Sequence, residues 1–477
     1  MDEQKRAALA AIDENGAVFT ALSDRIWESP ELSLKEHKAA ALYIQTLREL
    51  GFTVTEKLGG IDTAFCGAYG SGRPVIGILG EFDALSGLSQ KAGAAAEEPL
   101  VSGGNGHGCG HNLLGAGALA AAVAVKRYLE QSGAPGTVIF FGCPGEEGGA
   151  AKAYLARDGL WKELDAALSW HPSDVNQTVT GTNTACTQVL YRFSGTAAHA
   201  AGEPHVGRSA LDAVELMNIG VQFLREHMTD DCRIHYAITD AGGVSPNVVQ
   251  ARAAVLYMVR AAKVAETVAL QKRVDDIAKG AALMTGTSFE RVFIDGTAEL
   301  LPNFTLEELL YDNMEQIGAP VCPPEELAFM AALKETFPTS PLCGTGAHCD
   351  PAIRKQVAEL TERGTRAVND FLMPRFSGEA AEPGSTDVGD VSQLTPTAQL
   401  NAAVWPAGVP GHSWQIVACG KSRYAHAGLL FAGKALAGAA IDLLMRPELL
   451  AAAKEEFAGR AGGYVCPIEP DAVPIAL

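Results

Sequence analysis

Short apolar runs alternate with helical stretches between residues 62 and 172, and this alternation constrains the fold more than any other feature. The stretch 113–131 is built of small apolar residues and is expected to be helical. Strands that alternate with helices form a largely parallel sheet. We therefore predict an α/β fold with helices on both sides of such a sheet. Its expected buried strands are 63–69, 74–80, 136–142 and 166–170.

From residue 186 to residue 296 the pattern changes to β-α-β-β-α-β. The expected elements are a strand at 187–194, a helix at 208–228, strands at 233–239 and 251–261, a helix at 265–283 and a strand at 289–294. This order is typical of a compact ferredoxin-like unit with helices on one face of a small sheet. We predict an inserted domain at 186–296, between two parts of one catalytic domain at 1–185 and 297–477.

Composition restricts the class of protein. The 477 residues include 37 basic and 56 acidic ones, a net charge of −19 that argues against a nucleic-acid partner. No run of 18 apolar residues occurs, so we expect no membrane span, and the polar start lacks the apolar core of a secretory signal. The ten cysteines are irregularly spaced and do not form a disulfide framework. We expect a reduced, cytoplasmic protein.

Residue types that bind metals follow several of the predicted strands. They are Cys109 and His111 in the glycine-rich segment 106–112, the Glu146–Glu147 pair, His171, and His412 after a strand-like run at 398–404. Because parallel strands end at one edge of a sheet, these side chains are expected to converge. We predict a pair of divalent ions, with zinc favoured over manganese by a bridging thiolate. The alternative is a flexible glycine loop with an incidental cysteine.

The two adjacent glutamates suggest a division of labour. Neighbouring residues on a turn point in different directions, so one carboxylate can bind metal while the other faces a bound water. A divalent ion lowers the pKa of such a water from 15.7 to about 7. The unligated carboxylate can then take its proton and pass it to a leaving amine. The alternative is a solvated acidic pair at the start of a helix.

Together these motifs resemble the dinuclear-metal aminoacylase and carboxypeptidase family, in the branch of the indole-acetyl-amino-acid hydrolases. The resemblance extends over essentially the whole chain and implies a zinc-exopeptidase-like catalytic domain with an inserted dimerisation or lid domain. The matching residues are Pro30-Glu31-Leu32-Ser33 with Glu36-His37, residues 80–85, residues 106–112, Glu146-Glu147, Trp170-His171-Pro172 and Gly411-His412-Ser413.

The resemblance also implies roles for single residues. Glu146 would be the general acid and base, and Asp83 would orient ligands. Relatives outside this branch have histidine where Glu81 stands and aspartate where Cys109 stands, so the role of Glu81 stays open. His107 would point away from the ligands and is expected to support them or to be structural. The implied metal ligands are Cys109, His111, Glu147, His171 and His412.

Three residues of the inserted domain extend the resemblance. His199 would reach the active site of a neighbouring subunit and steady the oxyanion, a contact worth about 3 kcal/mol. Asn247 and Arg260 would contact the substrate carboxylate, for which the arginine fork is suited. The alternatives are a loop histidine for His199 and an exposed strand residue for Arg260.

The expected activity is metal-dependent hydrolysis of the amide in an N-acyl or N-aroyl amino acid, with p-aminobenzoyl-glutamate as the foremost substrate. A dipeptide is the alternative substrate, and a homodimer or a heterodimer with a related subunit is expected. Two other hypotheses are a Cys109 nucleophile with His111 or His107 as base, and a non-catalytic scaffold subunit. The segment 341–385 yields no structural prediction.

Overall fold

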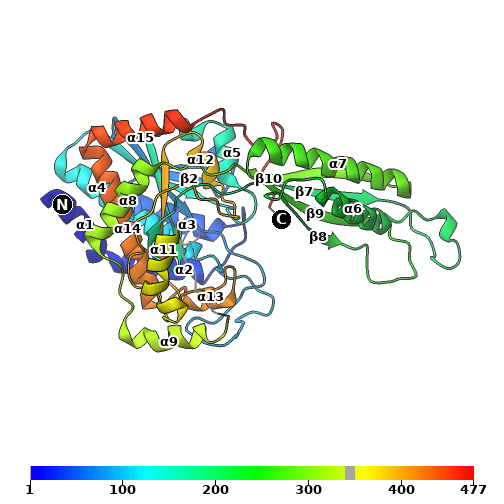
Figure 1. Ribbon diagram of the computed structural model, residues 1–477, viewed down its shortest axis with the longest axis horizontal. Helices are drawn as coiled ribbons and strands as arrows, with labels where there is room; N and C mark the ends of the chain where they lie inside the picture. The colour runs from blue at the N-terminus through cyan, green and yellow to red at the C-terminus, as the bar shows by residue number, and fades with distance from the viewer. Residues whose placement is uncertain (1, 339–349, 477) are drawn as a thin grey trace.

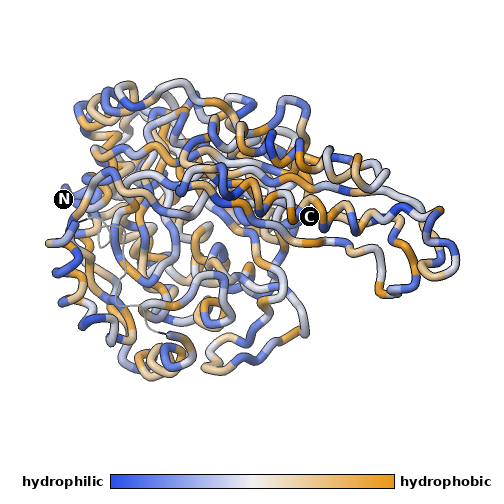
Figure 2. Tube along the Cα trace, turned by 45° about the vertical axis from the view of Figure 1, so that its right-hand side comes forward, coloured by the Kyte–Doolittle hydropathy of each residue, from blue (hydrophilic) through white to orange (hydrophobic). Residues whose placement is uncertain are grey.

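The computed structural model describes residues 2–338 and 350–476. Figure 1 shows a rounded body, from which an arm extends to one side. The body is built on a seven-stranded sheet, and the arm, residues 185–297, on a four-stranded sheet. Hydrophobic and hydrophilic stretches are interspersed along both parts (Figure 2). Residues 341–349 of the unassigned 341–385 segment lie outside the described residues.

The sheet of the body has the strand order β1-β2-β4-β3-β5-β11-β6. Its four central strands, β4, β3, β5 and β11, are parallel, which confirms the predicted sheet. The edges differ, because β2 is antiparallel to β4 and β6 is antiparallel to β11. The strands are β1 (Thr53–Glu56), β2 (Phe65–Ser71), β3 (Val75–Glu81), β4 (Gly136–Cys143), β5 (Ala166–Ser173), β6 (Gln177–Thr178) and β11 (Thr397–Ala403).

Both faces of this sheet are covered, because alternate side chains of a strand point to opposite faces. Ile78 and Phe140 belong to the large core, and Leu79 and Phe141 to a smaller core on the other face. The helices of the large core are α1 (Glu3–Glu14), α2 (Gly16–Trp27), α3 (His37–Glu49), α4 (His111–Ser132), α8 (Phe304–Ile317), α9 (Pro324–Lys334), α13 (Trp414–Cys419), α14 (Arg423–Met445) and α15 (Pro447–Arg460). The smaller core takes α5 (Ala151–Arg157) and α12 (Val388–Ser392), and α11 (Pro351–Leu360) packs on a minor cluster.

Helix α14 is long and apolar enough to cross a membrane by length and composition alone. In the fold, however, 78% of its most apolar window is buried. Its alanines and glycines allow close contact with α4, which lies beside it. These features are those of a core helix.

The arm has the predicted β-α-β-β-α-β order, with every neighbouring pair of strands antiparallel. The strand order β10-β7-β9-β8 is that of a ferredoxin-like sheet, and α6 and α7 share one core with it. The elements are β7 (Ala185–Ser194), α6 (Ala210–Arg225), β8 (Arg233–Asp240), β9 (Arg252–Ala261), α7 (Val264–Thr285) and β10 (Ser288–Thr297).

The C-terminal segment returns from the body to the arm, which no sequence pattern indicated. Ile468 is buried in the core of the arm. Glu469 forms an ion pair with Arg291 at 2.8 Å. On the body side, the Tyr154 hydroxyl donates to the carbonyl of Val473 at 3.2 Å. The segment therefore links the two parts of the molecule.

Candidate metal centre

The metal-binding residue types converge at the carboxyl edge of the central parallel strands. His171 lies within β5, opposite Asn401 of β11. Glu146 and Glu147 follow β4, and His412 follows β11 by a longer loop. The structure thus brings together segments that are far apart in the sequence, as the sheet topology predicts.

The turn before α4 places Cys109 and His111 at this edge. Gly110 caps the helix with φ +74°, a backbone conformation that favours glycine. A Cβ atom there would lie 3.0 Å from both Pro172 and Trp405. Glycine is therefore required both for the turn and for the close packing, and His111 becomes the first residue of the helix.

Among the described residues the potential ligands form three groups; one contains Glu81, His111 and Glu146, and the other two share Cys109. Of these two, the first contains Cys109, His111 and His171, and the second contains Cys109, Glu147 and His412; within each group the candidate ligand atoms lie within 4.8 Å of one another. Cys109 Sγ is 3.3 Å from His171 Nε2, and His412 Nε2 is 3.4 Å from Glu147 Oε1. A sulfur common to both groups suits a bridging ligand.

The donor set fits a pair of divalent ions. His111 Nδ1 bonds to Asp83 Oδ1 at 2.8 Å and His171 Nδ1 to the Pro172 carbonyl at 2.7 Å, so both rings direct Nε2 inward. His111 Nε2 and Glu147 Oε1 are buried, and neither has a hydrogen-bond partner among the described residues. Thiolate, imidazole and carboxylate are the ligands zinc prefers.

Burial shifts the protonation equilibria of these groups. It lowers the pKa of His171 to about 4, which favours the neutral imidazole that binds metal. It raises the pKa of the Cys109 thiol, and the Glu147 carboxylate adds to the effect. Burial, and then the nearby Glu81 and Glu147 carboxylates, raise the pKa of Glu146 well above that of an ordinary carboxyl group. A raised carboxyl pKa suits a proton carrier.

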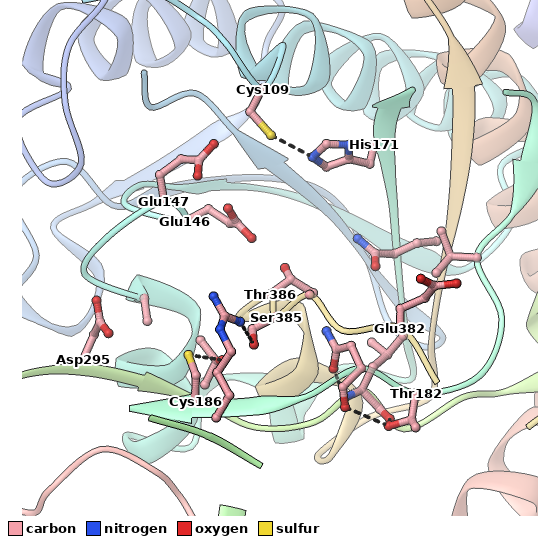
Figure 3. Close-up of a pocket in the computed structure, with 18 of the residues that line it drawn as sticks. Cys109, Glu146, Glu147, His171, Thr182, Cys186, Asp295, Glu382, Ser385 and Thr386 are labelled. Carbon is pink, nitrogen blue, oxygen red and sulfur yellow. Dashed lines mark hydrogen bonds between the residues drawn. The ribbon is translucent and has the colours of Figure 1, made fainter. Parts of the chain in front are cut away.

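These groups open onto a cavity of about 530 Å³ between the body and the arm. Figure 3 shows Cys109, Glu146, Glu147 and His171 grouped together in the upper part of the view. Arg260 of β9 lines the cavity, and its guanidinium donates to Ser385 Oγ at 2.5 Å. Other lining residues from the arm are Cys186, Gln188, Met258, Asp295 and Thr297.

The sequence profile of peptidase family M20/M25/M40 matches residues 77–336, which is more than half of the chain. The chain belongs to this peptidase family. One of the subunits of p-aminobenzoyl-glutamate hydrolase from Escherichia coli (strain K12) is 42% identical to it over 100% of both chains. The Xaa-Arg dipeptidase of Mus musculus is 28% identical over 95% of this chain and 92% of its own.

A solved structure agrees with this assignment at the level of the fold. A dinuclear metal-binding peptidase of the M20 family from Bacillus subtilis has a TM-score of 0.53 and 16% identity, covering 91% of this chain and 99% of its own. The family resemblance seen in the motifs is confirmed, and the protein is a metal-dependent hydrolase that acts on amide bonds. The chain is thus an M20 member in which two groups of candidate ligands share Cys109, and these side chains are the donors that a dinuclear metal centre needs.

The M20 chain also contains a buried ion cluster that the sequence did not reveal. Lys152 Nζ lies 2.8 Å from Glu81 Oε1 and 2.6 Å from Asp387 Oδ1, and all three side chains are buried. Glu81 Oε2 is 3.5 Å from His111 Nε2. Glu81 therefore pairs with an internal ammonium at the edge of the centre. Lys152 lies in an alanine-rich helix, and no sequence pattern there indicates that it would be buried against two carboxylates.

The other predicted site residues lie in two places. Arg260 lines the cavity of its own chain, whereas His199 and Asn247 are exposed and are not among the residues that line it. His199 Nδ1 accepts from the backbone N–H groups of Ala201 and Gly202 at 3.2 and 3.0 Å, which leaves Nε2 as a donor. His107 is buried, with Nε2 3.2 Å from the Ile26 carbonyl, which suits a structural role.

Proposed function

We propose that this protein hydrolyses the amide bond of N-acyl or N-aroyl amino acids, with p-aminobenzoyl-glutamate as the first substrate to test. The observation that carries the proposal is the convergence of five candidate ligand side chains with Glu146 at a cavity lined by Arg260. The name of the E. coli relative supports the choice of substrate.

In this proposal two divalent ions, zinc or manganese, are held by the two groups that share Cys109. When bound, such ions polarise the substrate carbonyl and lower the pKa of a water molecule. Asp83 keeps His111 in the tautomer that presents Nε2. Arg260 would hold the substrate carboxylate by two parallel hydrogen bonds.

Glu146 carries the proton in this mechanism. Its carboxylate takes a proton from the attacking water as oxygen bonds to the carbonyl carbon. It then gives the proton to the amide nitrogen as the carbon–nitrogen bond breaks. The products are a carboxylic acid and an amino acid, so one water is consumed for each bond cleaved.

A second copy or a related chain would complete the site. His199 and Asn247 do not line the cavity of their own chain, and the Nε2 of His199 is a suitable donor for an oxyanion. We propose that they serve the site of a partner, in a homodimer or in a complex with a related subunit. The E. coli relative supports the second arrangement, because its name describes it as one subunit of a hydrolase. The division at 1–185, 186–296 and 297–477, with the middle part as the dimerisation domain, belongs to this proposal.

A reducing, cytoplasmic location is also proposed. The described cysteines, eight in number, are free thiols, as expected for a reducing compartment. The support for this location is therefore the reduced state of these thiols.

A dipeptidase is the second candidate function. The cavity wall also carries Glu382, whose carboxylate would favour a substrate with a cationic side chain. The Xaa-Arg dipeptidase of Mus musculus is a relative over most of the chain. A screen of both substrate classes separates this candidate from an aroyl-glutamate hydrolase.

Two further hypotheses find less support in the site. A nucleophilic cysteine needs a lowered thiol pKa, whereas burial raises that of Cys109. A scaffold subunit would not need the complete set of ligands and the Glu146 carboxylate that this chain retains.

The test begins with chelator-treated protein that is reloaded with zinc or manganese. Rates are then measured on p-aminobenzoyl-glutamate, other N-acyl amino acids and Xaa-Arg dipeptides. We expect activity only after reloading, and we expect Glu146→Gln to keep its metal but lose about 10³-fold in kcat. Chelator-resistant turnover would support the cysteine nucleophile, and full activity of Glu146→Gln would refute the assigned base. A metal-loaded wild type that cleaves none of these compounds alone would favour the scaffold role.

A further inference from the structure

The loop that carries Glu146 and Glu147 forms a turn in which the Ala150 N–H donates to the Gly145 carbonyl at 2.8 Å. It runs from the end of β4 to the start of α5. Three of its residues, Gly145, Gly149 and Ala150, have positive φ values. A Cβ at Gly149 would lie 2.7 Å from the side chain of Leu34, so the loop also passes close to a neighbouring segment. Contacts from outside the loop add to this internal bond.

Four buried carboxylates from four separate segments provide that support. Each accepts a hydrogen bond from a backbone N–H of the loop or of the first turn of α5. The pairs are Gly145 with Glu36 at 2.8 Å, Glu147 with Asp83 at 2.9 Å, Gly149 with Asp295 at 2.7 Å and Lys152 with Asp387 at 2.9 Å.

Asp295 differs from the other three because it belongs to the arm. Glu36, Asp83 and Asp387 are all residues of the body, whereas Asp295 lies on β10. The pairing of β10 with β7 shifts register between Phe293 and Asp295. Such a bulge redirects a side chain out of the regular pleat. At this bulge the Asp295 side chain contacts the loop.

The neighbour of Asp295 in the sheet links it to the cavity. Gln188 stands opposite Asp295 in the register, and its Nε2 donates to Asp295 Oδ2 at 3.2 Å. The same oxygen accepts from the backbone of Gly149. On the other side of β7, Cys186 pairs with Arg260 of β9. The strand β7 thus connects Arg260, the proposed contact for the substrate carboxylate, to the support of the loop. Figure 3 shows Asp295 on the same side of the view as Glu146 and Glu147, below them.

We propose that Asp295 is a positioning residue. It holds the Gly149 end of the loop and thereby fixes the position of the Glu146 carboxylate relative to the arm. The inference rests on the proposed function, because it takes Glu146 as the proton carrier. A substrate carboxylate bound by Arg260 and the carboxylate that moves the proton are then fixed to the same sheet. Displacement of the arm would displace both together.

The test compares Asp295→Ala with Asp295→Asn in the full-length, metal-loaded protein. Asparagine keeps an oxygen that can accept from Gly149 and Gln188, whereas alanine removes it. We expect Asp295→Ala to lower kcat about 10- to 100-fold, with KM within roughly threefold of wild type and the metal content unchanged. We expect Asp295→Asn to restore kcat to within roughly threefold of wild type.

Asp295→Glu is the second variant. It keeps the carboxyl group as a hydrogen-bond acceptor but moves its oxygens by the length of one methylene group. It should lower kcat without raising KM, and it provides the test if the alanine variant does not fold. Wild-type kcat in both Asp295→Ala and Asp295→Glu would overturn the proposal. So would a rise in KM alone, or an asparagine variant as impaired as alanine, since either would mean that the charge contacts substrate. A wild type without activity would instead refute the proposed function.

Discussion

Cys109 is the residue on which the candidate centre depends, because it joins the group with His111 and His171 to the group with Glu147 and His412. Burial raises the pKa of its thiol, so binding of metal must displace a proton. Serine has nearly the same size but does not ionise in this range. We predict that Cys109→Ser binds fewer ions per chain and loses at least about 100-fold in kcat, which elemental analysis and initial rates would check.

A matched control is Cys143→Ser, since Cys143 is buried near the centre but belongs to neither ligand group. That variant should retain the wild-type metal content. Equal metal content in Cys109→Ser and wild type would contradict the bridging role.

The sequence indicated the candidate ligands but not the groups that hold them in place. Cys109, His171 and His412 each follow or end a strand, and this local signal predicts their convergence. Glu36 and Lys152 show no such signal, because their roles depend on partners more than a hundred positions away. Charged residues of this kind are usually exposed, so their burial becomes visible only in the structure.

At the scale of elements, α12 provides a prediction about pH. Its Asp390 accepts from the backbone N–H of Ala298 at 2.9 Å and from the Tyr464 hydroxyl at 2.6 Å. Burial raises the pKa of this carboxyl group from 3.8 to about 8. Between those values the folded chain keeps a proton that the unfolded chain releases, so the free energy of unfolding falls as the pH rises.

We predict that Asp390→Asn makes stability less dependent on pH, because asparagine has no proton to release. Its free energy of unfolding should fall less than that of wild type between about pH 5 and about pH 7.5, by up to about 1.4 kcal/mol per pH unit. Denaturant titrations at the two pH values measure the difference. Parallel slopes for the two proteins would show that Asp390 is ionised in the folded state.

The elements themselves were largely predictable where the pattern is strong. The central strands and the β-α-β-β-α-β unit occur where the alternation predicts them. Short apolar runs are typical of buried strands, so the pattern is read directly from the sequence. The two-residue strand β6 and helix α15 were missed. The path of residues 464–476 back to the arm was also missed, since contacts that connect distant elements have no local period.

For the whole molecule, the position of His199 outside the cavity lining predicts complementation between inactive variants. In a dimer of identical chains, a Glu146→Gln chain would still offer its His199 to a His199→Ala partner that has Glu146. Mixing the two variants under conditions of subunit exchange should restore about a quarter of wild-type activity, as expected for random pairing in a twofold dimer. No recovery despite exchange would mean that His199 acts in its own chain or not at all.

The dinuclear centre is tested most directly by anomalous diffraction from crystals of the metal-loaded protein at the zinc or manganese edge. Our account predicts two peaks about 3.5–4 Å apart, with Cys109 between them. One ion should lie against His111 and His171, and the other against Glu147 and His412. A single peak, or ions remote from Cys109, would contradict the account.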